Sequence, residues 1–144
     1  MYDEILVPTD GSPAAAAAIE HAVTLAERFD ATIHALYVVD MTGYTTLEAG
    51  TGVVVEALEE EGEAAVDAVR EAAEAADVPV TEHVVSGSPY RSILEYANDE
   101  EVDLIVMGTH GRRGLDRYLL GSVTERVVRS ADQAVMTVRM PDEE

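Results

Sequence analysis

Five short apolar runs alternate with helical patterns along this chain, and this alternation constrains the fold more than any other feature. The runs cover residues 4–9, 32–39, 80–86, 103–108 and 134–139. Residues 5–7 and 104–107 are continuously apolar, which is typical of strands covered on both faces in a parallel sheet. The pattern predicts an α/β fold with helices on both faces of an open parallel sheet. A length of 144 residues suits one domain over 1–144.

The chain is strongly acidic, with 29 aspartates and glutamates against nine arginines, no lysine and a formal net charge of −20. Such a surface suits concentrated salt, because at ~1 M salt the screening length falls to about 3 Å and carboxylates repel one another weakly. We therefore predict a halophilic protein; the alternative is an ordinary acidic protein that prefers arginine. Nucleic acid is disfavoured as a partner, since duplex DNA requires a basic face.

The sequence contains no cysteine. A disulfide framework, a thiolate zinc site, an iron–sulfur cluster and a cysteine nucleophile are therefore excluded. No apolar run approaches the ~20 residues of a membrane span, and the acidic start lacks the basic residues of a signal peptide. We expect a cytoplasmic protein that has no membrane partner.

The helices have readable starts. Ser12 precedes Pro13 and Ser88 precedes Pro89, which predicts two helices with hydroxyl N-caps. The longest helix is expected over about 55–76, with a thin stripe of small apolar residues toward the sheet and acids toward solvent. A mobile loop is expected over 40–52. A last helix is expected after Gly121.

Residues 108–130 hold five arginines against two acids, which indicates a segment that meets an anion. Arg112, Arg113 and Arg117 lie outside any expected helix end. Arg126 and Arg129 fall near the end of the last helix, where they could instead complement the helix dipole.

The most informative segment runs over residues 108–114 and is followed by Gly121 and Ser122 at a helix start. In open parallel sheets, ligands bind beyond the carboxyl ends of the strands, where glycines let backbone N–H groups approach phosphates. A helix N-terminus adds free N–H donors. Neither a Walker loop nor GxGxxG is present, and tight turns alone could also explain the glycines.

The spacing Gly108-x2-Gly111-x9-Gly121-Ser122, together with the strand ending Val-Pro-Thr-Asp-Gly-Ser over 7–12, resembles the universal stress protein family, in its UspA-like branch. The likeness covers essentially the whole chain. It implies a Rossmann-like fold of the adenine nucleotide alpha hydrolase type, with a five-stranded sheet in the order 3-2-1-4-5. It also implies an ATP site between the ends of the first and fourth strands.

By matching positions, the resemblance implies that Pro8, Val38 and Met107 wall the adenine and that Asp10 approaches the ribose or phosphates. The residues implied to hold ribose and phosphates are Gly108, Gly111, Gly121 and Ser122. Neighbouring residues that we include as candidates are Thr9, His110, Arg112, Arg113 and Val123, with the two arginines inferred from their charge. Mg²⁺ is expected with the ATP, through Asp10.

Simpler roles stay open for several of these residues. Asp10 could be a turn residue before Gly11, and Ser122 could be the N-cap of the last helix. Val38 and Met107 could be core residues. The four histidines, His21, His34, His83 and His110, lie on separate elements without metal-ligand spacing, and no GxSxG motif occurs. We assign no catalytic residue.

The resemblance indicates an ATP-binding stress-response protein in which nucleotide occupancy biases conformation or partner contacts. A slow ATPase or adenylyl-transferring enzyme, and a nucleotide-independent scaffold that uses the acidic helix, are the alternatives. A homodimer is expected through the last strand, because that edge strand is apolar and lacks protective charge or proline. Its apolar residues are Ala134, Val135, Met136, Val138 and Met140. The alternative is a monomer whose last strand is covered by helices.

Overall fold

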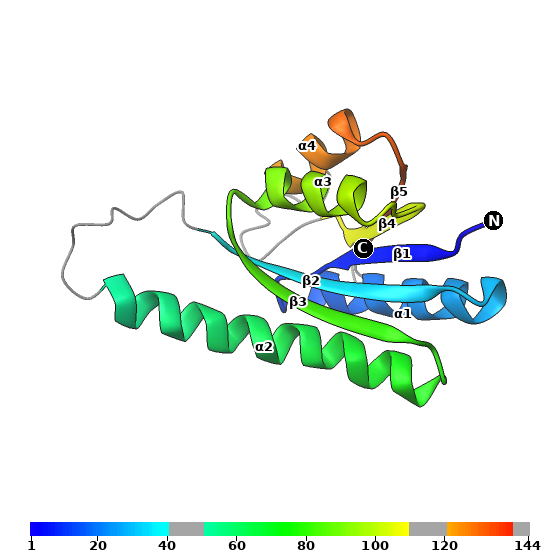
Figure 1. Cartoon of the computed structure of the whole chain (residues 1–144), viewed down its shortest axis with the longest axis horizontal. Coiled ribbons are helices and arrows are strands. Elements are labelled where there is room, and N and C mark those ends of the chain that lie inside the picture. Colours follow the sequence, from blue (N-terminus) through cyan, green and yellow to red (C-terminus); the bar gives the residue numbers. More distant parts are fainter. Residues whose placement is uncertain (41–50, 110–120, 140–144) are drawn as a thin grey trace.

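Strands and helices alternate along the chain in the computed structural model, which describes residues 1–40, 51–109 and 121–139. Figure 1 shows the arrangement. The elements in chain order are β1 (Glu4–Pro8), α1 (Pro13–Phe29), β2 (Thr32–Asp40), α2 (Thr51–Ala75), β3 (Val80–Gly87), α3 (Pro89–Asp99), β4 (Leu104–Gly108), α4 (Ser122–Ser130) and β5 (Ala134–Val138). Both ends of every expected strand agree with these bounds to within one residue.

The five strands form one parallel sheet in the order β3-β2-β1-β4-β5. This confirms the expected fold class and strand order. The central strands are buried on both faces: Ile5, Leu6 and Val7 have no exposed surface, and β4 is buried throughout. Their continuous apolar sequence follows from this position, because helices cover each side.

Each face of the sheet has its own hydrophobic cluster. Ile5 and Val7 point into a cluster with residues of α1 and α2, whereas Leu6 points into a cluster with Ile93 of α3 and Val127 of α4. Alternation along a strand produces this division, since successive side chains point to opposite faces. Helices α1 and α2 therefore cover one face, and α3 and α4 cover the other (Figure 1).

The two serine–proline helix starts differ. The Ser12 hydroxyl accepts a hydrogen bond from the Ala15 N–H at 3.3 Å, as expected for an N-cap. Ser88 occupies the N-cap position of α3, but its side chain makes no capping hydrogen bond, which corrects the expectation. The backbone turns differently at the two serines, with ψ angles of 164° and 122°.

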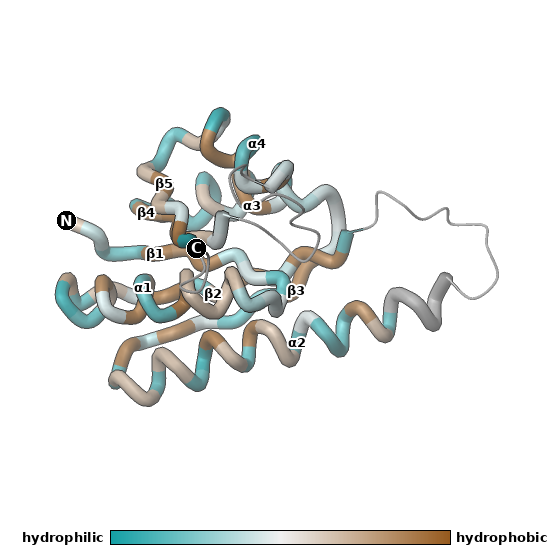
Figure 2. Tube along the Cα trace, turned by 180° about the vertical axis from the view of Figure 1, so that it is seen from behind, coloured by the Kyte–Doolittle hydropathy of each residue, from teal (hydrophilic) through white to brown (hydrophobic). Residues whose placement is uncertain are grey.

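Helix α2 packs its small residues closely against the sheet. A β-carbon on Gly62 would lie 2.6 Å from Cδ1 of Tyr37 on β2, so only glycine fits there without movement. Ala65, Val66 and Val69 are buried beside it, and hydrophilic and hydrophobic segments alternate along the helix in Figure 2. The expected stripe is confirmed.

Helix α2 begins one turn earlier than expected, at Thr51, and it contains Gly52. The cost of glycine and β-branched residues in a helix is small enough for the rest of the helix to offset. Asp40 is the last residue of β2, so the expected loop over 40–52 is shorter at both ends, and its residues 41–50 lie outside the described part.

Candidate functional site

The sheet opens between β1 and β4. The two strands pair at two positions, the second joining Leu6 to Ile105, although β1 continues to Pro8 and β4 to Gly108. On its other side, β1 stays paired with β2 as far as Pro8. The chain order of the strands reverses at this point, which is where open α/β sheets bind ligands. We call the region beyond the last β1–β4 pair the crevice.

Three predicted site residues share one face of the sheet at the crevice. Pro8, Val38 and Met107 lie at, or within two residues of, the carboxyl ends of β1, β2 and β4, and each lies two residues beyond a member of the cluster under α3 and α4. Those members are Leu6, Leu36 and Ile105. Since residues two apart on a strand point the same way, the three side chains form one apolar surface. Val123 of α4 packs against the same cluster.

All three of these residues are packed in the fold, and Pro8 is buried at the end of β1. Met107 is 6% exposed and belongs to the buried cluster itself, while Val38 is half-buried and packs against it. Core packing therefore accounts for Met107 without a ligand. The partly exposed Val38 leaves part of the surface open.

A tight turn orients Thr9 and Asp10 at the end of β1. Thr9 is buried and donates its N–H to the Leu36 carbonyl at 2.9 Å. The Asp10 Oδ1 accepts the Ser12 N–H at 2.9 Å, and Gly11 adopts a φ of 78° that favours glycine. Asp10 therefore acts as a turn residue, and the turn fixes its carboxylate at the carboxyl end of the sheet.

Gly108 is required by packing. A β-carbon there would lie 2.9 Å from both the backbone C and O atoms of Ala14, in the first turn of α1. The Thr124 hydroxyl donates to the Gly108 carbonyl at 2.9 Å, which ties α4 to the same point. Close approach of two backbone elements explains this glycine before any phosphate is considered.

Gly121 and Ser122 begin α4 at the carboxyl end of β4. The Gly121 N–H donates to the Thr109 carbonyl at 2.7 Å, and the Thr109 N–H donates to Val138 on β5. Gly121, rather than Ser122, is the N-cap, so the cap interpretation of Ser122 is corrected: Ser122 is the first helical residue and its side chain is exposed. The expected helix N-terminus at this site is confirmed.

The remaining predicted residues, His110, Gly111, Arg112 and Arg113, lie outside the described residues. In the described part of the chain, no group of three or more His, Asp or Glu side chains is arranged to hold a metal ion. Nor is any helix there long and apolar enough to cross a membrane.

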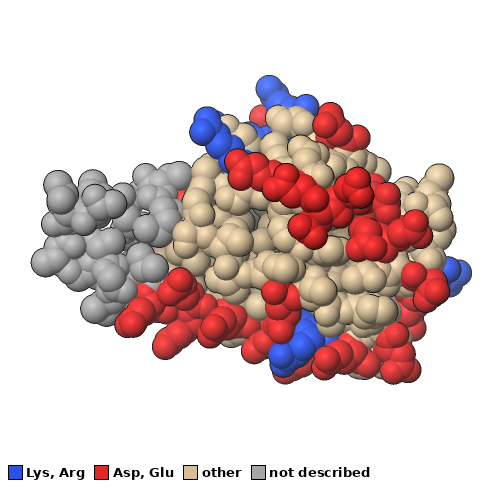
Figure 3. Space-filling view, viewed as in Figure 1, with Lys and Arg blue, Asp and Glu red and all other residues tan. Residues whose placement is uncertain are grey.

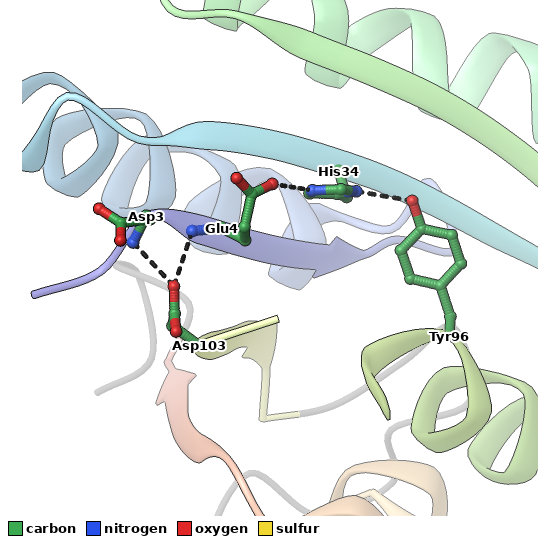
Figure 4. A network of polar contacts seen from close by, with 5 residues as sticks. All are labelled: Asp3, Glu4, His34, Tyr96 and Asp103. Carbon is green, nitrogen blue, oxygen red and sulfur yellow. Dashed lines mark hydrogen bonds and ion pairs between the residues drawn. The ribbon is translucent and has the colours of Figure 1, made fainter. Parts of the chain in front are cut away.

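Sequence reasoning missed a polar network at the opposite, amino end of the sheet (Figure 4). His34 on β2 is 6% exposed; its Nε2 lies 2.6 Å from Glu4 Oε1, and its Nδ1 lies 2.6 Å from the Tyr96 hydroxyl. A neutral imidazole that donates to the carboxylate accepts from the phenol. Burial raises the pKa of Tyr96, and the His83 ring lies 5.0 Å from the Tyr96 ring.

The same network ties β1 to β4. Asp103 accepts hydrogen bonds from the backbone N–H groups of Asp3 and Glu4, at 2.8 and 2.9 Å. Hydrogen bonds therefore join the amino ends of β1 and β4, whereas the carboxyl ends of these strands separate. No sequence signal pointed to these pairs, because the partners lie 99 and 100 residues apart.

The model of the universal stress protein family matches residues 1–139. The universal stress protein MJ0531 of Methanocaldococcus jannaschii is 41% identical over 146 residues, which cover 100% of this chain and 86% of that protein. The solved structure of the protein MJ0577, from the same organism, matches with a TM-score of 0.86 and 31% identity over 99% of each chain.

Two more distant structures contain nucleotides. A universal stress protein in complex with cAMP is 24% identical, with a TM-score of 0.76 over 96% of this chain and 98% of that one. An Arabidopsis thaliana family protein with AMP bound is 18% identical, with a TM-score of 0.73 over 97% of this chain and 93% of that one. At these identities the likeness shows a common fold.

Proposed function

The chain belongs to the universal stress protein family, and we propose that it binds an adenine nucleotide, ATP with Mg²⁺, in the crevice between β1 and β4. The observation that carries this proposal is the apolar surface of Pro8, Val38 and Met107, placed where the two strands part. An adenine ring is flat and apolar on its faces, so it suits such a surface. Relatives of the same fold hold cAMP and AMP.

The phosphates would extend toward the start of α4. Gly121 and Ser122 present a helix N-terminus there, where free N–H groups and the helix dipole favour an anion. The exposed Ser122 hydroxyl adds a donor. On sequence grounds, His110, Gly111, Arg112 and Arg113 complete the phosphate side.

The residues at the crevice fit Mg²⁺ only as part of a nucleotide complex. Asp10 supplies a carboxylate at the end of β1, where the turn fixes it. Mg²⁺ usually binds one or two carboxylates together with substrate phosphates and water, rather than an all-protein cage. The ion, when bound, would neutralise phosphate charge, and Asp10 would hold it on the β1 side.

Nucleotide occupancy would act as a switch, because the ligand contacts both sides of the opening. A nucleotide changes a conformational equilibrium only by as much as its affinities for the two states differ. Hydrogen exchange of β1 and β4 amides with and without ATP tests the switch. Equal exchange in both states would leave binding without a conformational role.

Binding itself is tested on the untagged protein in molar salt. Mass spectrometry of the small molecules that copurify should identify an adenine nucleotide. Calorimetry with ATP should give a dissociation constant in the micromolar range, about −8 kcal/mol. A folded protein that binds neither ATP nor adenosine at millimolar concentration would overturn the proposal.

The acidic surface supports a salt-rich cytoplasm as the working environment. In Figure 3 carboxylates line the lower edge of the molecule, where α2 lies, and spread across the upper right of the face, while basic side chains lie at the top and at separate points on the lower and right edges. Repulsion between carboxylates reaches further as salt is diluted, since the screening length grows to about 10 Å at 0.1 M. The melting temperature should therefore fall on dilution from molar salt, and an unchanged value would contradict this inference.

A homodimer through β5 is also part of the proposal. β5 lies at the edge of the sheet, beside β4 alone. Val135 and Met136 are half-buried on this edge, and Arg139 follows the strand. A second copy that pairs antiparallel about a twofold axis would cover the exposed main-chain groups.

A further inference from the structure

Tyr90, in the first turn of α3, lies between two guanidinium groups. The Cζ of Arg126, on α4, is 4.8 Å from the centre of the Tyr90 ring, and the Cζ of Arg91 is 5.8 Å from it. The Arg91 Nε also donates a hydrogen bond to the Tyr90 hydroxyl at 3.2 Å. Both cations are within the range of a cation–π contact. Two helices thus bring two positive charges to one phenol.

This pairing of like charges is unusual in so acidic a chain. Arg70 forms ion pairs with Asp67, Glu74 and Glu82, and Arg129 pairs with Glu125. Arg91 and Arg126, by contrast, form no ion pair with any carboxylate among the described residues. Two converging guanidinium groups repel each other, and a negative charge between them removes that repulsion.

The surroundings of the phenol already favour negative charge. The hydrogen bond from Arg91 lowers the pKa of Tyr90 below its ordinary value, and the charges of Arg91 and Arg126 act in the same direction. Glu95 is a nearby acid further along α3. Of the groups that change the pKa of Arg91, Glu95 has the smallest effect.

We propose that Tyr90, Arg91 and Arg126 bind a phosphoryl group on the surface shared by α3 and α4. The phenol hydroxyl and two guanidinium forks offer donors in the planar arrangement that matches phosphate oxygens. A small phosphorylated molecule fits better than a nucleic-acid strand or a long polyphosphate, because the net charge of −20 repels an extended polyanion. Arg126 therefore has a binding role beyond the helix-dipole role considered from the sequence.

Two sources could supply the phosphoryl group. Tyr90 packs against the same hydrophobic cluster as Val38 and Val123, so the phosphates of a nucleotide in the crevice are one source. Free inorganic phosphate is the other. The inference does not require the proposed function, since free phosphate can bind without a nucleotide.

The test compares Arg126→Gln with Arg129→Gln, which makes the same charge change on the same helix. Binding of inorganic phosphate, ATP and adenosine is measured by calorimetry in molar chloride. A charge-assisted hydrogen bond contributes enough for Arg126→Gln to weaken phosphoryl binding by about tenfold or more, whereas Arg129→Gln should change it by less than about twofold. Arg126→Lys, which keeps the charge and most of the packing, should lose part of the affinity because it lacks the fork.

The pattern of losses identifies the source. Weaker binding of inorganic phosphate in Arg126→Gln assigns the site to the free anion, and weaker binding of ATP alone assigns it to the nucleotide. Equal effects of the two glutamine variants, or no loss with either ligand in a folded Arg126→Gln protein, would overturn the proposal. Adenosine reports on the crevice separately: if it fails to bind wild-type protein while phosphate binds, the nucleotide proposal fails and this one stands.

Discussion

The backbone of Gly108, at the end of β4, lies against the backbone of Ala14 in the first turn of α1. A β-carbon on Gly108 would come within 2.9 Å of the Ala14 carbonyl carbon and oxygen. Neither atom belongs to a flexible side chain, so relief requires a shift of α1 or β4. The closeness of these two elements fixes the position of the carboxyl end of β4 relative to the start of α1.

Gly108→Ala should therefore lower the free energy of unfolding, by about 1–3 kcal/mol for an overpacked site. Gly121→Ala is the matched control, because Gly121 has φ −63° and ψ 156°, which any residue adopts. Urea unfolding in molar salt measures both. If the two variants were equally stable, the contact with Ala14 would not constrain position 108.

Gly121→Val should separate binding from folding. The bulky side chain would stand where phosphates approach the start of α4, so ATP affinity should fall by at least about tenfold, while the melting temperature changes little. Adenosine, which lacks phosphates, should bind the variant as it binds the wild type. Undiminished ATP binding by folded Gly121→Val would contradict the placement of the phosphates.

Tyr96→Phe should destabilise the protein through His34. Loss of the hydroxyl leaves the buried His34 Nδ1 without its 2.6 Å partner, which costs about 1–3 kcal/mol for an unsatisfied buried group. Tyr2→Phe is the control, since the Tyr2 ring packs edge-on against Phe29 and would keep that contact. Chemical denaturation that ranks the two variants equally would argue against the network.

Glu82 on β3 should make stability depend on pH. A hydrogen bond with Asp67 is the largest cause that raises the pKa of Glu82, burial adds to it, and the Arg70 charge opposes it. Because the folded-state pKa lies above the unfolded-state value, this contribution is greatest below the ordinary carboxyl pKa and is lost as the pH rises through the raised value.

Glu82→Gln should remove this pH-dependent loss of stability, since an amide can donate a hydrogen bond to Asp67 at any pH. Relative to wild type, the variant should gain stability as the pH rises from about 4 to 7. Glu60→Gln, on the exposed face of α2, controls for the change in net charge. Parallel melting profiles for all three proteins would exclude a shared proton between Glu82 and Asp67.

Thr137→Pro should test the β5 dimer. The Val138 carbonyl accepts from Thr109, so residue 138 faces β4 and the main-chain N–H of Thr137 faces the open edge. Proline at 137 removes an outward donor and is tolerated on an edge. Light scattering should report a monomer for Thr137→Pro and a dimer for Thr137→Ala; a wild-type monomer at tens of micromolar would refute the dimer.

The strands could be predicted from the sequence because burial on both faces leaves a continuous apolar run, as in residues 104–107. Helix starts were harder, since Ser12 and Ser88 share a Ser-Pro sequence and yet Ser12 alone caps with its side chain. The start of α2 was missed because Gly52 reads as a loop residue. The local sequence indicates where a turn or helix start falls, whereas the backbone angles at the capping residue depend on tertiary packing.

The candidate site divides in the same way. Pro8, Val38 and Met107 could be matched by motif, and alternation along the strands explains why they share a face. The packing contact that requires glycine at position 108 could not be predicted from the sequence, since its partner, Ala14, is far away in the chain. The convergence of Arg126 on Tyr90, and of His34 on Glu4 and Tyr96, likewise depends on contacts between distant elements.

The seam between β1 and β4 divides the sheet into two unequal blocks. Eight register pairs join β3 to β2, five join β2 to β1 and five join β4 to β5, but two cross the seam. The described main-chain ladder is therefore weakest there, although Asp103 fastens its amino end. A ligand that contacted Pro8 on one block and Met107 on the other would hold the two blocks together. With such a ligand bound, thermal unfolding would be more cooperative, because the two blocks would melt as one unit.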